Sequence, residues 1–140
     1  MWLRKQPRDY SYTPEMDYVA TKDAPAAIGP YSQAVIANGF VFTSGQVSLD
    51  PASGNIVEGN FEAQARRVFD NLAAVLAAAG SGFDRVTKAT VYVTDLANFA
   101  ALNTIYAEYF GDHKPARTTV QVPALPKGSL LEIDLVALAK

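Results

Sequence analysis

The sequence predicts an α+β domain in which two helices cover one face of a mixed β-sheet. Strand-like runs alternate with two long segments of helical periodicity, which favours right-handed crossovers between parallel strands. A hairpin signal precedes the first helix, and two further strand-like runs follow the second. With 140 residues, of which 49% are hydrophobic, the chain is long enough for one compact core. We divide it into an irregular N-terminal extension, residues 1–16, and a single domain, residues 17–140.

Three β-rich runs come first. A short run within residues 15–22 leads into the loop Asp23–Tyr31, in which two prolines and a glycine oppose regular structure. Residues 32–37 and 40–46 then form a predicted hairpin. Its turn is Asn38-Gly39, a pair that suits a type I′ turn because both central residues need positive φ.

Apolar residues at three-four spacing predict the two helices. The loop of residues 47–60 is rich in turn residues, so we expect a surface loop that borders a pocket. Asn60 is the predicted cap of a helix over residues 61–79. Asp95 is the predicted cap of a second helix, which ends at Phe110 and whose apolar stripe is Phe99, Leu102, Ile105, Tyr106, Tyr109 and Phe110.

The remaining strands are expected at residues 86–93, 118–122 and 130–138. A long connection with two prolines separates the last two, which suits a jump over another strand. Two-residue alternation places Gly45 on the helix face of the sheet. It places on the opposite face Phe40, Phe42, Ser44, Lys88, Thr90, Tyr92, Glu132, Asp134, Val136 and Leu138. That face is half apolar, so we expect a homo-oligomer to cover it.

Composition limits the chemistry. Twelve basic and fourteen acidic residues give a net charge of −2, which argues against electrostatic binding of nucleic acid. The chain has no cysteine and one histidine, His113, so neither a thiolate nucleophile nor a cluster of histidine metal ligands is available. We expect His113 to be solvated near the helix end, and we expect no metal. No apolar run is long enough for a membrane span, so we expect no membrane association and a cytoplasmic location, with the mitochondrial matrix left open.

Charged residues in the last two strand-like runs, or just before them, form the candidate site. Glu132 and Asp134 lie side by side on one strand face, and a bare buried carboxylate is costly. Arg117 can make a planar two-pronged contact, either with these acids or with the carboxylate of a ligand. Judged from these residues alone, a structural ion pair at an interface is as reasonable as a catalytic site.

Five blocks in order make the chain recognisable: Ala24-Pro-Ala-Ala-Ile-Gly-Pro-Tyr-Ser-Gln33, Val41-Phe-Thr-Ser-Gly-Gln46, Leu102-Asn-Thr-Ile-Tyr106, Pro115-Ala-Arg117 and Leu131-Glu-Ile-Asp134. With them, residues 18–138 resemble the RidA (YjgF-like) family of enamine/imine deaminases. The resemblance implies a chorismate mutase-like fold and a homotrimer with pockets between subunits. It also implies hydrolysis of 2-iminopropanoate and 2-iminobutanoate to 2-oxo acids and ammonia, without a cofactor.

The resemblance also implies roles for individual residues. Arg117 binds the substrate carboxylate, and Glu132 activates the attacking water. The other ligand-binding residues that it implies are Tyr31, Ser44 and Asn103, and we expect Gly45 and Thr119 to bind the ligand as well. Backbone N–H groups around Ser44 and Gly45 suit an anion, since glycine permits close approach. A core amide with satisfied hydrogen bonds is nearly as good an interpretation of Asn103 as a ligand contact. Thr119 lies in a strand where many relatives have a cysteine.

Two other classes of function stay open. One is a non-enzymatic trimer that binds small carboxylates or acts as a chaperone-like module. The other is an endoribonuclease or translation inhibitor, which the acidic balance and the lack of a basic and aromatic stripe disfavour.

Overall fold

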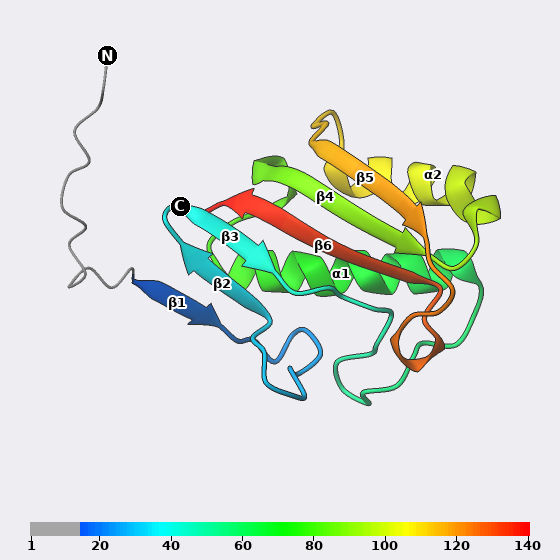
Figure 1. Ribbon diagram of the computed structural model, residues 1–140, viewed down its shortest axis with the longest axis horizontal. Coiled ribbons are helices and arrows are strands. Elements are labelled where there is room, and N and C mark those ends of the chain that lie inside the picture. The colour runs from blue at the N-terminus through cyan, green and yellow to red at the C-terminus, as the bar shows by residue number, and fades with distance from the viewer. Residues whose placement is uncertain (1–14) are drawn as a thin grey trace, which may run out of the picture.

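A computed structural model describes residues 15–140 and confirms the α+β class. Six strands form one sheet in the order β1-β2-β3-β6-β4-β5, and both helices lie on the same face of it (Figure 1). The strands are β1 (Met16–Val19), β2 (Ala34–Ala37), β3 (Phe40–Thr43), β4 (Val86–Val93), β5 (Ala116–Gln121) and β6 (Leu131–Leu138), and the helices are α1 (Phe61–Ala78) and α2 (Phe99–Phe110). Of the expected N-terminal extension, residues 1–14 lie outside the described part, and Met16 begins β1.

The hairpin and the crossover form as the sequence predicts. Strands β2 and β3 pair antiparallel around Asn38 at φ 54° and Gly39 at φ 83°, the positive values that the turn requires. Strands β4 and β5 are parallel and are connected through α2. The connection from β5 to β6 passes beyond β4, so β6 lies between β3 and β4 and pairs antiparallel with both.

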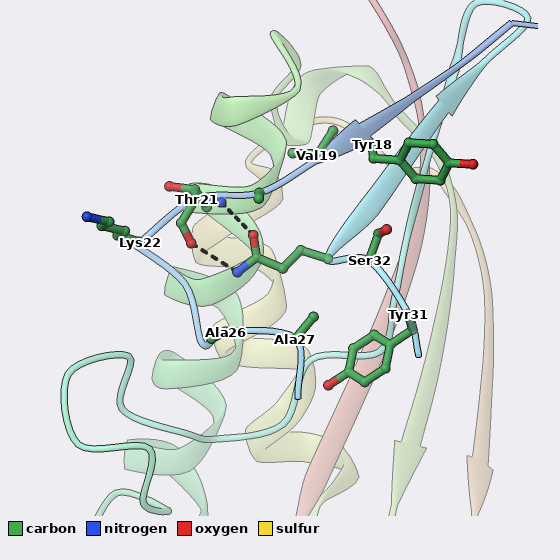
Figure 2. Close-up of a pocket in the computed structure, with 10 residues that line it drawn as sticks. Tyr18, Val19, Thr21, Lys22, Ala26, Ala27, Tyr31 and Ser32 are labelled. Carbon is green, nitrogen blue, oxygen red and sulfur yellow. Dashed lines mark hydrogen bonds between the residues drawn. The ribbon is translucent and has the colours of Figure 1, made fainter. Parts of the chain in front are cut away.

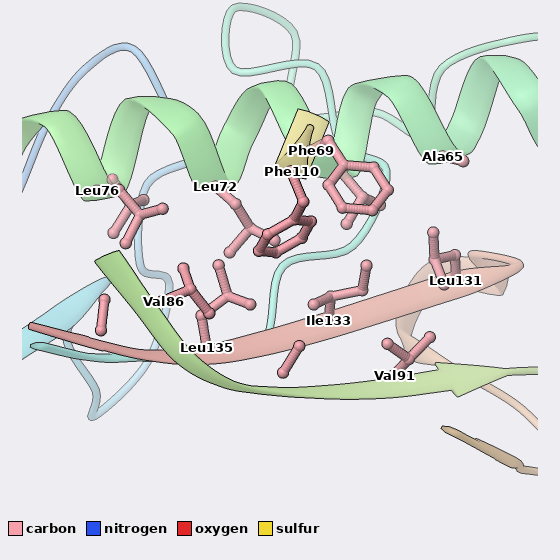
Figure 3. Close-up of a cluster of buried hydrophobic side chains, with 14 of the residues drawn as sticks. Ala65, Phe69, Leu72, Leu76, Val86, Val91, Phe110, Leu131, Ile133 and Leu135 are labelled. Atoms are coloured by element: carbon pink, nitrogen blue, oxygen red, sulfur yellow. The ribbon is translucent and has the colours of Figure 1, made fainter. Parts of the chain in front are cut away.

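The core lies between α1 and the centre of the sheet. Figure 3 shows Phe69, Leu72 and Leu76 of α1 directed toward β6 and β4. These three side chains have no exposed surface, and neither does Ile133 on β6. Each fully buried side chain of this size contributes about 1.5–3 kcal/mol to folding relative to an exposed one. Asn60 caps α1 as expected, since its side chain accepts a hydrogen bond from the Ala63 amide at 3.0 Å.

Two local expectations are wrong. Asp95 accepts from the Ala97 amide and caps a short 3₁₀ turn, Leu96–Asn98, so the α-helix itself begins only at Phe99. His113 is half-buried, and its Nε2 lies 2.6 Å from the Val86 carbonyl oxygen. Because a carbonyl only accepts, Nε2 carries the proton, and the ring ties the end of α2 to the start of β4.

A β-bulge follows β3 and overturns the expected face of Gly45. Phe42 pairs with Val136 and Gln46 pairs with Ile133, so the β3 side contains one more residue than the β6 side between these pairs. Thr43 Oγ1 accepts from the Leu135 amide at 2.9 Å and replaces a backbone bond there. The extra residue turns Gly45 toward Glu132 and buries Gln46. Gly45 therefore lies on the face of the sheet away from the helices, which we call the outer face. A bulge has this effect because the side-chain period of a strand is two.

Candidate functional site

Glu132 lines a cavity of about 540 Å³ on the outer face of the sheet. The cavity is formed by the loop before β2, the bulge after β3, and the connection before β6. Its lining residues are Ala26, Ile28, Tyr31, Ser44, Gly45, Val47, Leu49, Pro126, Lys127 and Glu132. The loop of residues 47–60 therefore borders a pocket as predicted, although its first residues, Val47 and Ser48, are buried rather than at the surface.

The carboxyl group of Glu132 is half-buried on β6 opposite Tyr92 of β4. Burial raises the pKa of Glu132 above its usual value, and the negative charge of Asp134 raises this pKa further. A carboxyl group with a raised pKa holds a proton more readily near neutral pH than a solvated one does. It is therefore suited to accept a proton and return it.

The bulge brings backbone close to Glu132. A Cβ atom on Gly45 would lie 2.8 Å from Glu132 Oε1 and 2.9 Å from its Cδ, so only glycine leaves the carboxylate in place. The Ser44 amide already donates to the Gln33 carbonyl at 2.9 Å, and Ser44 Oγ donates to the Ser32 carbonyl at 2.5 Å. Within residues 15–140 the Gly45 amide has no hydrogen-bond partner. Of the two amides, those of Ser44 and Gly45, only the second is therefore available to a ligand.

Gln33 holds the loop that carries Tyr31. This buried side chain accepts from the Thr21 amide at 2.6 Å and donates to the carbonyls of Thr21, Ala24 and Pro25 at 2.8–3.3 Å. Figure 2 shows Thr21 and Lys22 on one side of the adjoining hollow and Tyr31 on the other. The Tyr31 side chain is 55% exposed, so a fixed loop presents it at the surface rather than in the core.

Arg117 lies on the other face of the sheet. It is level with the buried Ala89 of β4, so its side chain lies on the helix side at the edge strand β5. Its Nη1 donates to Asn103 Oδ1 at 2.8 Å, and its Cζ is 4.9 Å from the ring centroid of Tyr106 and 5.5 Å from that of Phe99. Asn103 is thus a partner of Arg117, and within residues 15–140 its amide nitrogen has no hydrogen-bond partner.

The two charged candidates do not meet within one chain. Arg117 lines a separate hollow of about 390 Å³ at the end of α2, together with Asn103 and Tyr106. Among residues 15–140 the one ion pair is between Arg66 and Glu108, on the exposed surfaces of α1 and α2. Arg117 and Glu132 therefore do not pair within one chain, and they line separate hollows on opposite faces of the sheet.

The hydroxyl group of Thr119 is buried and has no hydrogen-bond partner in the described part of the chain. Thr119 is two residues beyond Arg117 on the same strand face. Sequence reasoning placed Phe99 and Tyr106 only in an apolar stripe and missed their contact with Arg117. The seven-residue spacing of the two aromatic residues on one helix face was the available signal.

Comparisons with known proteins agree on the family. The family described as endoribonuclease L-PSP matches residues 21–139. The chain belongs to this family, which is the RidA (YjgF-like, RutC) family. A RutC family protein from Synechocystis is 52% identical over 124 residues, which cover 87% of this chain and 95% of that protein. The human 2-iminobutanoate/2-iminopropanoate deaminase is 45% identical over 120 residues, 86% of this chain and 88% of the human one.

A solved structure shares both fold and sequence with this RidA-family chain. The Rid family protein YyfA from Yersinia pestis superposes with a TM-score of 0.87 at 46% identity, covering 89% of this chain and 100% of that one. Within residues 15–140 no group of three or more His, Asp or Glu residues is placed to hold a metal ion. None of the helices described is long and apolar enough to cross a membrane.

The close approach of Gly45 to Glu132 gives a structural prediction. Gly45→Ala should fold, because the backbone of Gly45 is not in the left-handed region, but its methyl group will displace the Glu132 carboxylate. A crystal structure of the variant should show Glu132 in a different rotamer, with a melting temperature close to that of the wild type. An unmoved Glu132 in a well-folded variant would show that the glycine is not required for the position of the carboxylate.

Proposed function

We propose that this protein hydrolyses 2-imino acids such as 2-iminopropanoate and 2-iminobutanoate to 2-oxo acids and ammonia. We further propose that it does so as a homotrimer with active sites between protomers. The observation that carries the proposal is that Arg117 and Glu132 lie on opposite faces of the sheet. In the proposal each residue forms one half of a site, an arginine half and a carboxyl half. The deaminase name of the human relative supports the reaction class.

Assembly is proposed because each half-site alone lacks the other charge. The outer face also presents apolar side chains that a monomer would leave in water, among them Phe42 at 46% exposure and Leu138 at 40%. Packing this outer face against a neighbouring protomer in a closed ring buries these side chains. It also brings the Glu132 cavity of one protomer toward Arg117 of the next, which completes a site.

The chemistry follows from the two halves. In the proposed site Arg117 holds the substrate carboxylate through its free N–H groups, which places the adjoining C=N carbon for attack. Glu132 accepts a proton from water as the oxygen bonds to that carbon, and the C=N electrons move to the nitrogen, which takes this proton from Glu132 and becomes an amine. Glu132 then accepts the proton of the new hydroxyl group and donates it to the nitrogen, so the C=O bond forms as the C–N bond breaks and ammonia leaves.

The other candidate residues assist this reaction by contact with the substrate. Within residues 15–140 the Gly45 amide has no hydrogen-bond partner, and in the proposal it stabilises developing negative charge. In the proposal, Tyr31 and Ser44 shape the Glu132 half, and Asn103 and Thr119 shape the Arg117 half. No residue role in this scheme calls for a cofactor.

A carboxylate-binding trimer without catalysis is the second candidate, because the Arg117 half-site would serve it equally well. That function would not use the raised pKa of Glu132, so the two candidates differ in their dependence on this residue. We do not propose ribonuclease activity, because the sole histidine is engaged with the Val86 carbonyl and the chain is acidic.

Glu132→Gln tests the reaction. Glutamine has nearly the same shape but cannot accept the proton of water, so ammonia release should fall roughly 10²–10⁴-fold while 2-oxobutanoate still binds. The assay couples the protein to a dehydratase that generates the imine in place, and the melting temperature is measured on the same sample. Wild-type turnover in a folded Glu132→Gln variant would remove Glu132 from the mechanism and favour the non-enzymatic candidate.

Asp134→Asn tests whether the charge of Asp134 raises the pKa of Glu132. The base works when ionised, so the rate should fall as the pH drops through the raised pKa of Glu132. Removing the charge of Asp134 lowers this pKa, because charge repulsion no longer opposes ionisation, and the acidic limb of the kcat/KM profile should move to lower pH. Asp84→Asn, an exposed acid outside the cavity lining, is the control and should leave the limb in place. A limb that stays unchanged in Asp134→Asn would contradict this effect of Asp134.

A further inference from the structure

One stripe of α2 meets the guanidinium group of Arg117. Phe99, Asn103 and Tyr106 are four and three residues apart, a spacing that places them on one face of the helix, above β5. All three contact Arg117: the asparagine through a hydrogen bond of 2.8 Å, and the two rings at 5.5 Å and 4.9 Å from Cζ to the ring centroid. A helical stripe that packs only against a core would not meet a charged group in this way.

These contacts leave one edge of the guanidinium free. The bond to Asn103 uses a single N–H of Nη1, and within residues 15–140 no hydrogen bond involves Nε or Nη2. A carboxylate takes two parallel N–H donors, and the Nε and Nη2 edge provides such a pair. The rings limit rotation of the planar group by cation–π contact, so this edge keeps one orientation.

The hydroxyl group of Tyr106 takes no part in these contacts. It is buried and has no hydrogen-bond partner among the described residues, so the ring is the part of Tyr106 that acts on Arg117. Burial raises the pKa of this hydroxyl, and the nearby charge of Arg117 opposes that rise. The hydroxyl therefore stays protonated at neutral pH and presents no charge to a ligand.

We propose that Tyr106, assisted by Phe99, is a positioning residue that fixes the plane of Arg117 and keeps its Nε and Nη2 edge open for the carboxylate of a 2-oxo or 2-imino acid. The proposal rests on the function proposed above. In this proposal, the two aromatic residues of α2 increase the affinity for the ligand by orienting Arg117, and neither touches the ligand itself.

Two substitutions at one position separate the ring from the hydroxyl group. Tyr106→Leu removes the ring and should weaken 2-oxobutanoate binding about five- to thirty-fold by calorimetry, the range that a partly desolvated cation–π contact supports. Tyr106→Phe keeps the ring and should bind like the wild type. In ammonia release, Tyr106→Leu should raise KM more than it lowers kcat, because the carboxylate contact is made in both the ground state and the transition state.

Tyr109→Leu is the matched control for lost packing. Tyr109 lies on the same helix, but its ring stacks on Phe69 at a centroid distance of 4.8 Å, and its hydroxyl donates to Asp70 at 2.9 Å. Its replacement should lower the melting temperature and leave 2-oxobutanoate affinity unchanged. Equal losses of affinity in Tyr109→Leu and Tyr106→Leu would reduce the effect to general packing and overturn the proposal.

The remaining outcomes are also decisive. Wild-type affinity in Tyr106→Leu, or a loss in Tyr106→Phe as large as in Tyr106→Leu, would overturn the positioning role. If Tyr106→Leu does not fold, Phe99→Leu replaces it, because Phe99 is 41% exposed and its loss is tolerable, and a weaker affinity is again expected. A wild-type protein that binds 2-oxobutanoate but releases no ammonia defeats the proposed reaction alone, since the Tyr106 comparison is made on binding.

Discussion

Strand β6 is the constraint on which the rest of the structure depends. It lies between β3 and β4 and pairs antiparallel with both, so its two faces cannot be exchanged without breaking two ladders. Leu131, Ile133 and Leu135 take the face covered by α1 and have almost no exposed surface. The period of two then sends Glu132 and Asp134 to the opposite face. The position of the candidate base is thus a consequence of core packing.

The position of Arg117, the other charged candidate residue, depends on a parallel strand at the sheet edge. Arg117 is level with Ala89, so the register of β5 on β4 sends its side chain to the helix side, where α2 is the nearest element. This arrangement separates the two charges in one chain and is the physical reason for proposing a site shared between protomers. It also explains why an arginine in an edge strand is ordered by side chains of a helix.

Much of this fold could be predicted from the sequence, because its signals are local. The Asn38-Gly39 turn, the Asn60 cap and the apolar stripe of α1 depend on neighbouring residues, and all three form as predicted. The face of Gly45 could not be predicted, because the bulge that turns it is a property of the pairing between β3 and β6. The contact of His113 could not be predicted either, because its partner, the Val86 carbonyl, is 27 residues away in sequence.

Some features of the candidate site could likewise be predicted from the sequence, and others could not. Motif residues such as Glu132 and Arg117 could be identified by their chemistry and by their family resemblance. Their placement on opposite faces could not, since alternation within a strand does not give the register against its neighbour. Phe99 and Tyr106 have the spacing of core residues, and only the structure shows that both rings also contact a cation.

Mixing two inactive variants tests the shared site most directly. Arg117→Ala and Glu132→Gln chains are unfolded together and refolded at equal concentration, and mixed oligomers are verified by native mass spectrometry. If each site takes its arginine from one protomer and its carboxylate from the next, random mixing restores about a quarter of the sites and of the ammonia release of the wild type. Mixed oligomers that stay as inactive as either variant alone would contradict the account, because both groups would then belong to the same protomer.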